Sequence, residues 1–182
     1  RTTNRKDFSI DPTSETMLDV LQTAGINTVA IGKINDLYNY RGINKKVKTT
    51  SNLQGIENII KESKSNSDSL IYTNLVDFDV YYGHRNDPKG FYTALKEFDE
   101  KLPLIVETID ESDLLLITAD HGNDPTDIST DHTREYVPVL LYQKGVEGIN
   151  LGIRETFADF AQTIMHFYKI NNALKGKSML IN

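Results

Sequence analysis

The sequence predicts an α/β fold, with a mostly parallel sheet and helices on both faces of that sheet. Short runs of apolar or β-branched residues, each of strand length, alternate along the chain with segments whose apolar residues recur at helical spacing. Strands and helices that alternate in this way build parallel sheets, because each connecting helix crosses over a face of the sheet.

The first part of the chain is predicted to contain a polar lead-in, one helix and one strand. Residues 1–12 are polar and irregular. A helix capped by Thr13 or Ser14 then presents an apolar face and stops at Gly25, because glycine commonly ends helices. The β-branched run 28–31 predicts a strand.

The middle of the chain is predicted to contain a long loop, two helices and a strand between them. Residues 33–51 show no clear period and predict a loop, and isoleucines at helical spacing predict a helix over 55–61. The run 70–76 has the length of a buried strand and ends in acidic residues. Pro88 can open the next helix, and Pro103 is expected to kink that helix or to start a new one.

The last part is predicted to contain two strands and a final helix. The apolar run at 114–117 has the length and the boundaries of a fully buried strand, and 137–142 predicts another strand after a polar loop. A helix over about 156–168 is expected to bury a stripe made of Phe157, Phe160, Ala161, Ile164 and Phe167.

Composition places the chain among ordinary globular proteins. Its 182 residues are 38% hydrophobic and 25% charged, enough for one sizeable core, and we expect one domain. The formal net charge of -6 argues against a nucleic-acid or membrane-surface role, since both of those surfaces are anionic. The absence of cysteine excludes disulfides and thiolate metal sites. No stretch resembles a membrane span or a signal peptide, and a first residue other than Met suggests a fragment or a processed product.

Acidic residues and histidines gather where the predicted strands end, which is where open α/β sheets place their ligands. Together they supply the carboxylate and imidazole atoms that suit Mn, Zn or Fe. The alternative is that these are solvated loop residues, but three histidines beside strand ends favour a metal site. His166 lies inside the last predicted helix and is expected to be structural. The candidate ligands are Asp79, His84, Asp120, His121 and His132.

Other polar residues near these positions have two possible roles. Lys33 follows a predicted strand and is a candidate phosphate contact, and Arg134 either holds a substrate phosphate or pairs with its acidic neighbours. Five aspartates either orient the imidazoles or only solvate the loops: Asp77, Asp87, Asp124, Asp127 and Asp131.

Three segments carry a family resemblance. Residues 76–88, 118–125 and 130–138 closely resemble the phosphopentomutase family, which belongs to the alkaline phosphatase superfamily. The Asp-His-Gly element at 120–122 is shared across that superfamily, and the strings around His84 and His132 narrow the match. The likeness extends to the opening Arg-Thr-Thr-Asn-Arg and to 31–34, so that it covers essentially the whole chain.

The resemblance implies a site with two Mn²⁺ ions, although other divalent ions are possible. Asp79, His84 and His132 would hold one ion, and Asp120 with His121 would hold the second. The matching substrate contacts are Lys33 and Arg1. The family interconverts ribose 1-phosphate and ribose 5-phosphate, and the deoxyribose pair, through a phosphothreonine and a sugar bisphosphate.

The resemblance also implies that residues 1–182 form the C-terminal portion of an alkaline-phosphatase-like core. The first core strands, with the nucleophilic threonine and one aspartate ligand, and nearly all of the cap domain have no match here. We therefore expect the chain alone to bind metal weakly and to turn over nothing. A pentose phosphate substrate, no nucleic-acid or membrane partner and a cytoplasmic location are expected; the oligomeric state is not indicated.

Two alternatives stay open at the level of sequence. Another enzyme of the superfamily, such as a metal-dependent phosphoglycerate mutase or a phosphodiesterase, would share the Asp-His-Gly element but should differ around His84 and His132. A non-catalytic metal-binding or interaction domain that kept the fold is the second alternative.

Overall fold

The computed structural model describes residues 9–65 and 68–180. These residues cluster into two compact units, which are described separately below. Of the described residues, unit 1 combines 9–48, 68–74 and 151–180. Unit 2 combines residues 49–65 and 75–150.

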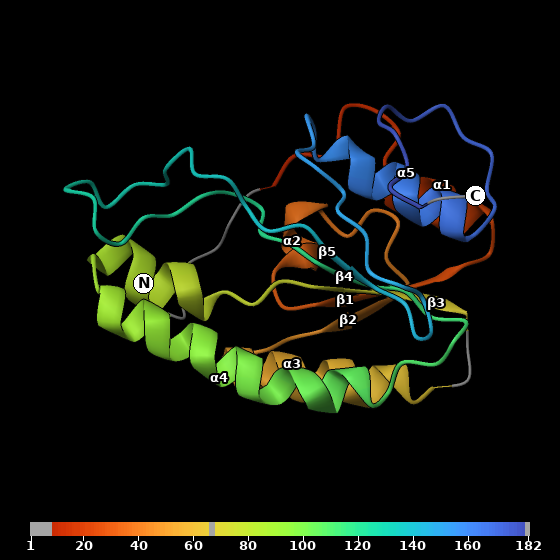
Figure 1. The fold of residues 1–182 in the computed structure, drawn as a ribbon. Helices are drawn as coiled ribbons and strands as arrows, with labels where there is room; N and C mark the ends of the chain where they lie inside the picture. Colours follow the sequence, from red (N-terminus) through yellow and green to blue (C-terminus); the bar gives the residue numbers. More distant parts are fainter. Residues whose placement is uncertain (1–8, 66–67, 181–182) are drawn as a thin grey trace. The chain divides into compact units, whose positions relative to one another are not determined.

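Unit 1 contains a three-stranded parallel sheet. Strand β1 (Asn27–Ile31) lies between β2 (Lys45–Val47) and β3 (Ser69–Thr73), and both pairs run parallel (Figure 1). Four of the five residues of β1 are buried, because helices α1 and α2 contact this central strand of a parallel sheet. The predicted α/β class with a parallel sheet and helices is confirmed.

Strand β2 and the short helix α2 (Ile34–Leu37) fall in the segment that was predicted to be a loop. That prediction is wrong there because a long-range contact aligns the segment with β1. The Thr28 N–H donates to Asn44 Oδ1 (2.9 Å), and the Asn44 N–H donates to Thr28 Oγ1 (3.1 Å). Three residues that include two lysines carry little periodic signal of their own.

Two longer helices complete unit 1. Helix α1 (Met17–Thr23) begins two or three residues later than predicted, since its cap is Thr16, whose side chain and N–H exchange hydrogen bonds with Asp19. Helix α5 (Ala158–Phe167) contacts α1. The two helices bury Leu18, Leu21, Ile164 and Met165.

The buried face of α5 differs from the predicted aromatic stripe. Phe157 is exposed, whereas Asp159 and Thr163 are buried. The chain after α5 returns across this face: the Lys177 N–H donates to Asp159 Oδ1 (2.9 Å), and the Met179 N–H donates to Thr163 Oγ1 (3.0 Å). These backbone N–H groups donate hydrogen bonds to the two polar side chains and so allow them to be buried. A hydrophobic pattern cannot predict such buried polar residues.

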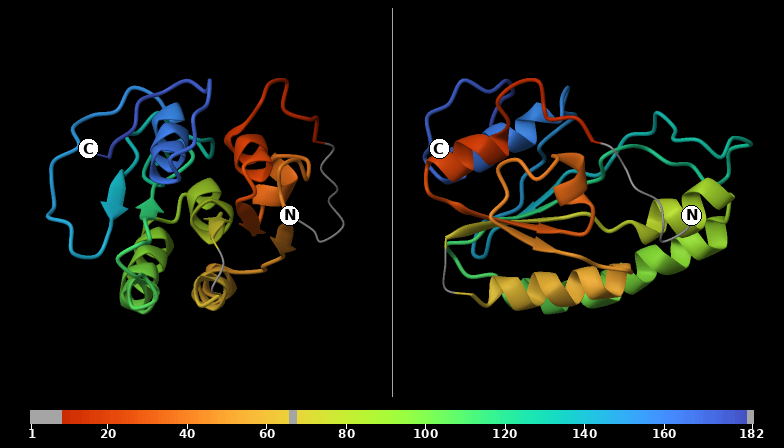
Figure 2. Two further views of the ribbon diagram at one scale, coloured as in Figure 1. Left: turned by 90° about the vertical axis from the view of Figure 1, so that its right-hand side faces the viewer. Right: turned by 180° about the vertical axis from the view of Figure 1, so that it is seen from behind.

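Unit 2 is built on two helices that lie side by side. Helix α3 (Asn52–Ser63) is capped by Ser51 and contacts the long helix α4 (Pro88–Val106), which is capped by Asp87 (Figure 2). Contrary to the prediction, α4 continues through Pro103 as one helix and ends at Val106. Buried apolar residues of the unit include Ile56, Ala94, Ile105 and Ile109.

Unit 2 contains two short strands that form an antiparallel pair, unlike the parallel strands of unit 1. Strand β4 (Leu115–Ile117) is antiparallel to β5 (Leu140–Tyr142), so only the end of the predicted strand 137–142 forms a ladder. Both β3 and β4 were predicted to be buried strands, β4 fully so, and both are half-buried. Within the described residues each has a ladder partner on one edge only.

Among the described residues, no helix combines the length and the apolar character that a membrane crossing requires.

The Asp159 carboxylate is expected to contribute strongly to the stability of unit 1. Arg154 donates to Asp159 Oδ2 through Nε (2.8 Å) and pairs with it through Nη2 (2.7 Å). Desolvation raises the pKa of Asp159, but hydrogen bonds from the Lys177 N–H and Arg154 and the charges of both residues lower it more. The net pKa therefore lies below the ordinary 3.8.

Replacing Asp159 with Asn should lower the free energy of unfolding at neutral pH by about 3 kcal/mol, because it leaves Arg154 without its counter-charge. A lowered pKa stabilises the fold above the unfolded-state pKa, and this contribution is lost as pH falls through the folded-state value. Chemical denaturation at pH 7 and well below pH 3.8 measures both effects. The exposed-residue control Glu147→Gln should change neither, and an equal loss at both pH values would contradict the assignment.

Candidate metal centre

Two consecutive tight turns of unit 2 carry the first two candidate ligands. Asp79 lies in the π-helical turn η1 (Phe78–Tyr82), and His84 lies in the 3₁₀ turn η2 (Gly83–Arg85) that follows at once. The start of η1 is tied to α3, since Asp77 Oδ2 accepts the Asn52 N–H (2.7 Å) and the Asp77 N–H donates to Asn52 Oδ1 (3.0 Å). Single π-helical turns are rare in proteins as a whole, and those that occur are often found at functional sites.

The other candidate ligands lie on the loop that follows β4. This loop is closed by an isolated antiparallel bridge between Gly122 and Thr133, in which the Thr133 N–H donates to the Gly122 carbonyl (3.1 Å). A Cβ at position 122 would lie 2.5 Å from the Thr133 carbonyl oxygen and 2.6 Å from the Glu135 nitrogen. The glycine of the Asp-His-Gly element therefore lets the two segments approach, and the bridge brings His121 and His132 together.

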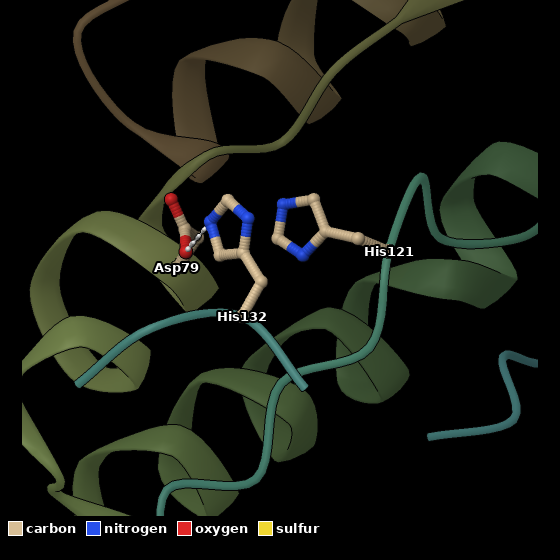
Figure 3. A group of neighbouring side chains, drawn as sticks. All are labelled: Asp79, His121 and His132. Atoms are coloured by element: carbon tan, nitrogen blue, oxygen red, sulfur yellow. Dashed lines mark ion pairs between the residues drawn. The ribbon is translucent and has the colours of Figure 1, made fainter. Parts of the chain in front are cut away.

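The ligand atoms of Asp79, His121 and His132 all lie within 4.8 Å of one another, which is close enough for one ion to contact all three. Figure 3 shows His132 between Asp79 and His121. His132 Nε2 is 3.3 Å from Asp79 Oδ1, and the rings of His121 and His132 stack with their centroids 3.6 Å apart. Residues separated by more than 40 positions in the chain thus meet in one cluster.

His84 and Asp120 lie at the edges of this cluster. His84 Nε2 is 3.2 Å from Asp79 Oδ1, and its ring centroid is 4.9 Å from that of His132. Asp120 Oδ1 is 3.7 Å from His121 Nε2, and this carboxylate is exposed. All five predicted ligands are therefore adjacent to another member of the set. Their division into two groups, one for each ion, stays a prediction.

Backbone carbonyls decide which ring nitrogen faces the cluster. His84 Nδ1 is 2.6 Å from the Thr130 carbonyl oxygen, and His121 Nδ1 is 3.1 Å from the Gly122 carbonyl oxygen. A carbonyl can only accept, so both Nδ1 atoms donate and both neutral rings keep a lone pair on Nε2. The His84 lone pair then faces a carboxylate oxygen, an arrangement that a cation between them stabilises. The donor set fits a divalent ion.

The five aspartates that could have oriented the imidazoles make other contacts. Within the part of the chain that the structure describes, none of them hydrogen-bonds a histidine. The carboxylates of four of them accept backbone N–H groups, at Asn52, Gly90, Thr126 and Ile128. The Thr126 hydroxyl and N–H together lower the pKa of Asp124. For Asp131 the hydrogen bond is made by its own N–H, which donates to Ser129.

The predicted substrate contacts are dispersed along the chain. Lys33 lies in unit 1, between the end of β1 and the start of α2. Arg134 is an exposed residue of unit 2, directly after the Gly122–Thr133 bridge. Arg1 lies outside the residues that the structure describes. Their role in binding phosphate stays a prediction.

Sequence reasoning missed two contributors to the cluster. The Asn123 amide donates to Asp79 Oδ1 (3.3 Å), and the Thr130 carbonyl orients His84. Asn123 directly follows the Asp-His-Gly element, so its position was a usable signal. The contribution of Thr130 is a backbone oxygen, and no residue type could have indicated it.

Comparison with known proteins identifies a superfamily for this chain. A family model described as "Metalloenzyme superfamily" matches residues 2–172, so the chain belongs to the metalloenzyme superfamily. This agrees with a cluster of carboxylate and imidazole groups that can hold a metal ion.

The curated relatives narrow the similarity to phosphopentomutases. The chain is 49% identical over 177 residues to the phosphopentomutase of Clostridium kluyveri, covering 97% of this chain and 46% of that protein. It is 46% identical over 179 residues to the phosphopentomutase of Clostridioides difficile, covering 98% of this chain and 46% of that protein. The chain therefore spans somewhat less than half the length of these relatives.

The fold is also that of a distant solved structure. The phosphoglycerate mutase of Leishmania mexicana, crystallised at low cobalt concentration, matches with a TM-score of 0.68. The match covers 88% of this chain and 38% of that chain at 18% identity, so it supports the fold alone.

Replacing Gly122 with Ala should destabilise unit 2 by about 1–3 kcal/mol, because the added Cβ forces apart the closely packed backbone. Chemical denaturation measures this loss. Gly148→Ala is the matched control, since a Cβ there meets nothing within 4 Å and should change stability by less than about 1 kcal/mol. Equal stability of both variants would show that the close approach at Gly122 carries no cost.

Millimolar Mn²⁺ or Co²⁺ should raise the melting temperature of the chain, because an ion that binds only the folded state stabilises it. An ion at 100 times its Kd would contribute about 2.7 kcal/mol. His132→Ala should abolish this response. His166→Ala should retain it, since His166 lies near the end of α5 and hydrogen-bonds Ser178. A response that survives in His132→Ala would place the ion elsewhere.

Proposed function

We propose that the chain corresponds to the C-terminal part of a phosphopentomutase catalytic core, and that its histidine–aspartate cluster contributes to a site for two Mn²⁺ ions. The observation that carries the proposal is 46–49% identity to phosphopentomutases over almost the whole chain, with Asp79, His121 and His132 in contact distance of one ion. The substrate would be a pentose phosphate, and the protein would act in the cytoplasm.

The five candidate ligands would hold the ions. Asp79, His84 and His132 are assigned to one ion, and Asp120 and His121 to the other. When bound, such ions neutralise phosphoryl oxygens and polarise the attacking oxygen. The chain's own contribution is orientation, since the carbonyls of Thr130 and Gly122 accept the Nδ1 hydrogens and leave each Nε2 free to bind.

An acidic chain needs cations to attract an anionic sugar phosphate. The net charge of -6 would otherwise repel the substrate, so bound metal and a few basic side chains must supply the attraction. Lys33 and Arg134 are assigned to the substrate phosphate, because ammonium and guanidinium groups form short, charge-assisted hydrogen bonds with phosphate oxygens. Arg1 is assigned the same role from the family resemblance.

The covalent step is assigned to a polypeptide of the relatives' length. In the family a threonine receives the phosphoryl group, and the sugar passes through a bisphosphate; no residue of this chain matches that threonine. The 182 residues would therefore supply ligands and phosphate contacts to a reaction that they do not carry out alone.

The proposal is tested by comparing this chain with a polypeptide that carries it at the relatives' full length, both supplied with Mn²⁺. The longer protein is expected to bind two ions and to convert ribose 1-phosphate to ribose 5-phosphate. The 182-residue chain is expected to bind ions more weakly and to show no turnover. In the longer protein, His132→Ala should slow the reaction by more than about 100-fold, because it removes a ligand outright.

Two results would contradict the proposal. Turnover of 3-phosphoglycerate in place of ribose 1-phosphate would indicate a different enzyme of the superfamily. Equal metal binding by both polypeptides, with no activity in either, would indicate a non-catalytic metal-binding domain.

A further inference from the structure

The oxygen Oδ1 of Asp79 is approached by three nitrogen atoms, one from η2 and two from the loop after β4. His84 Nε2 lies at 3.2 Å, His132 Nε2 at 3.3 Å and Asn123 Nδ2 at 3.3 Å. This oxygen is the point at which η1, η2 and the loop after β4 meet. A group that orients the Asp79 carboxylate therefore also determines the geometry of the cluster.

Asn123 differs from the two histidines because its amide always donates. The His84 ring uses its Nδ1 hydrogen on the Thr130 carbonyl, so in the neutral ring Nε2 is an acceptor that faces another acceptor. A carboxylate can only accept hydrogen bonds. The amide group of Asn123 therefore presents its nitrogen, and not its oxygen, to Asp79. Asn123 can hold Asp79 in place without a proton on either ring.

Gly83 provides the space in which this amide lies. Its backbone angles, φ -61° and ψ -61°, suit any residue, so backbone conformation does not require a glycine there. A Cβ on Gly83 would lie 2.7 Å from Cγ and 2.8 Å from Oδ1 of Asn123. Gly83 is also the joint between the turn that carries Asp79 and the turn that carries His84.

We propose that Asn123 is a positioning residue that orients the Asp79 carboxylate toward the ion assigned to Asp79, His84 and His132, and that Gly83 is small so that the Asn123 side chain can reach Asp79. This role rests on the metal site of the proposed function. It assigns a task to the residue that follows the Asp-His-Gly element. The same role predicts that a larger residue at Gly83, which is not a candidate ligand, would disturb the metal site.

The test uses the 182-residue chain with Co²⁺ as the probe. Co²⁺ affinity is measured by titration calorimetry, and the visible absorption spectrum of the bound ion reports its coordination. Asn123→Ala should weaken Co²⁺ binding by about 10- to 100-fold and alter the spectrum, the effect expected when a group that orients a ligand is lost. Gly83→Ala should give a similar loss, because its methyl group displaces the Asn123 amide.

The double variant Gly83→Ala/Asn123→Ala separates this role from a general loss of packing. The methyl group at position 83 would then enter space that the amide has left, so the double variant should bind Co²⁺ about as well as Asn123→Ala alone. Asn58→Ala is the matched control, since its amide donates to the Gln54 carbonyl within α3. The control should keep the affinity and the spectrum of the wild type.

Each outcome decides a different point. Unchanged affinity and spectrum in Asn123→Ala, even with a lowered melting temperature, would show a purely structural role and overturn the proposal. Losses that add in the double variant would overturn the link between Gly83 and Asn123. A wild-type chain that binds no Co²⁺ would overturn the proposed metal site and this role with it.

Discussion

The candidate centre depends on the hydrogen bonds that the Gly122 carbonyl oxygen accepts. It accepts the Thr133 N–H at 3.1 Å, which closes the loop after β4, and it lies 3.1 Å from His121 Nδ1, whose hydrogen it accepts. One backbone oxygen therefore brings His132 beside His121 and also selects the nitrogen that His121 presents. The close approach is possible because residue 122 has no Cβ. After the bridge the chain runs back along β4, and β5 therefore pairs with β4 in an antiparallel manner.

Backbone groups carry most of the orientation in this centre. The Thr130 carbonyl holds His84, the Gly122 carbonyl holds His121, and the Asn86 amide fixes the loop through the Asp127 carbonyl (2.8 Å). The nearby aspartates are occupied with caps and turns. This division is physically reasonable, because a carbonyl on a closed loop cannot ionise and adds no further negative charge to an acidic site.

The sequence predicted the elements with a strong periodic or apolar signal and missed those that depend on distant partners. The helices α3 and α4 and the strands β1 and β3 lie where the patterns placed them, within a few residues. Strand β2 has only three residues and exists because Asn44 and Thr28 align it with β1. The π-turn at Asp79 and the unbroken course of α4 through Pro103 were also not predicted, since local propensity disfavours both.

By itself the sequence determined the chemistry that the centre can have: carboxylates and imidazoles at strand ends, no thiolates, and a net negative charge that needs a cation to attract an anion. It also carried the motifs that the relatives share. Only the tertiary structure decided which atoms meet. It placed His121 against His132, directed each Nε2 inward and set the Asn123 amide on Asp79. The reason is that residue types are local properties, whereas distances, tautomers and backbone acceptors are set by contacts between segments far apart in the chain.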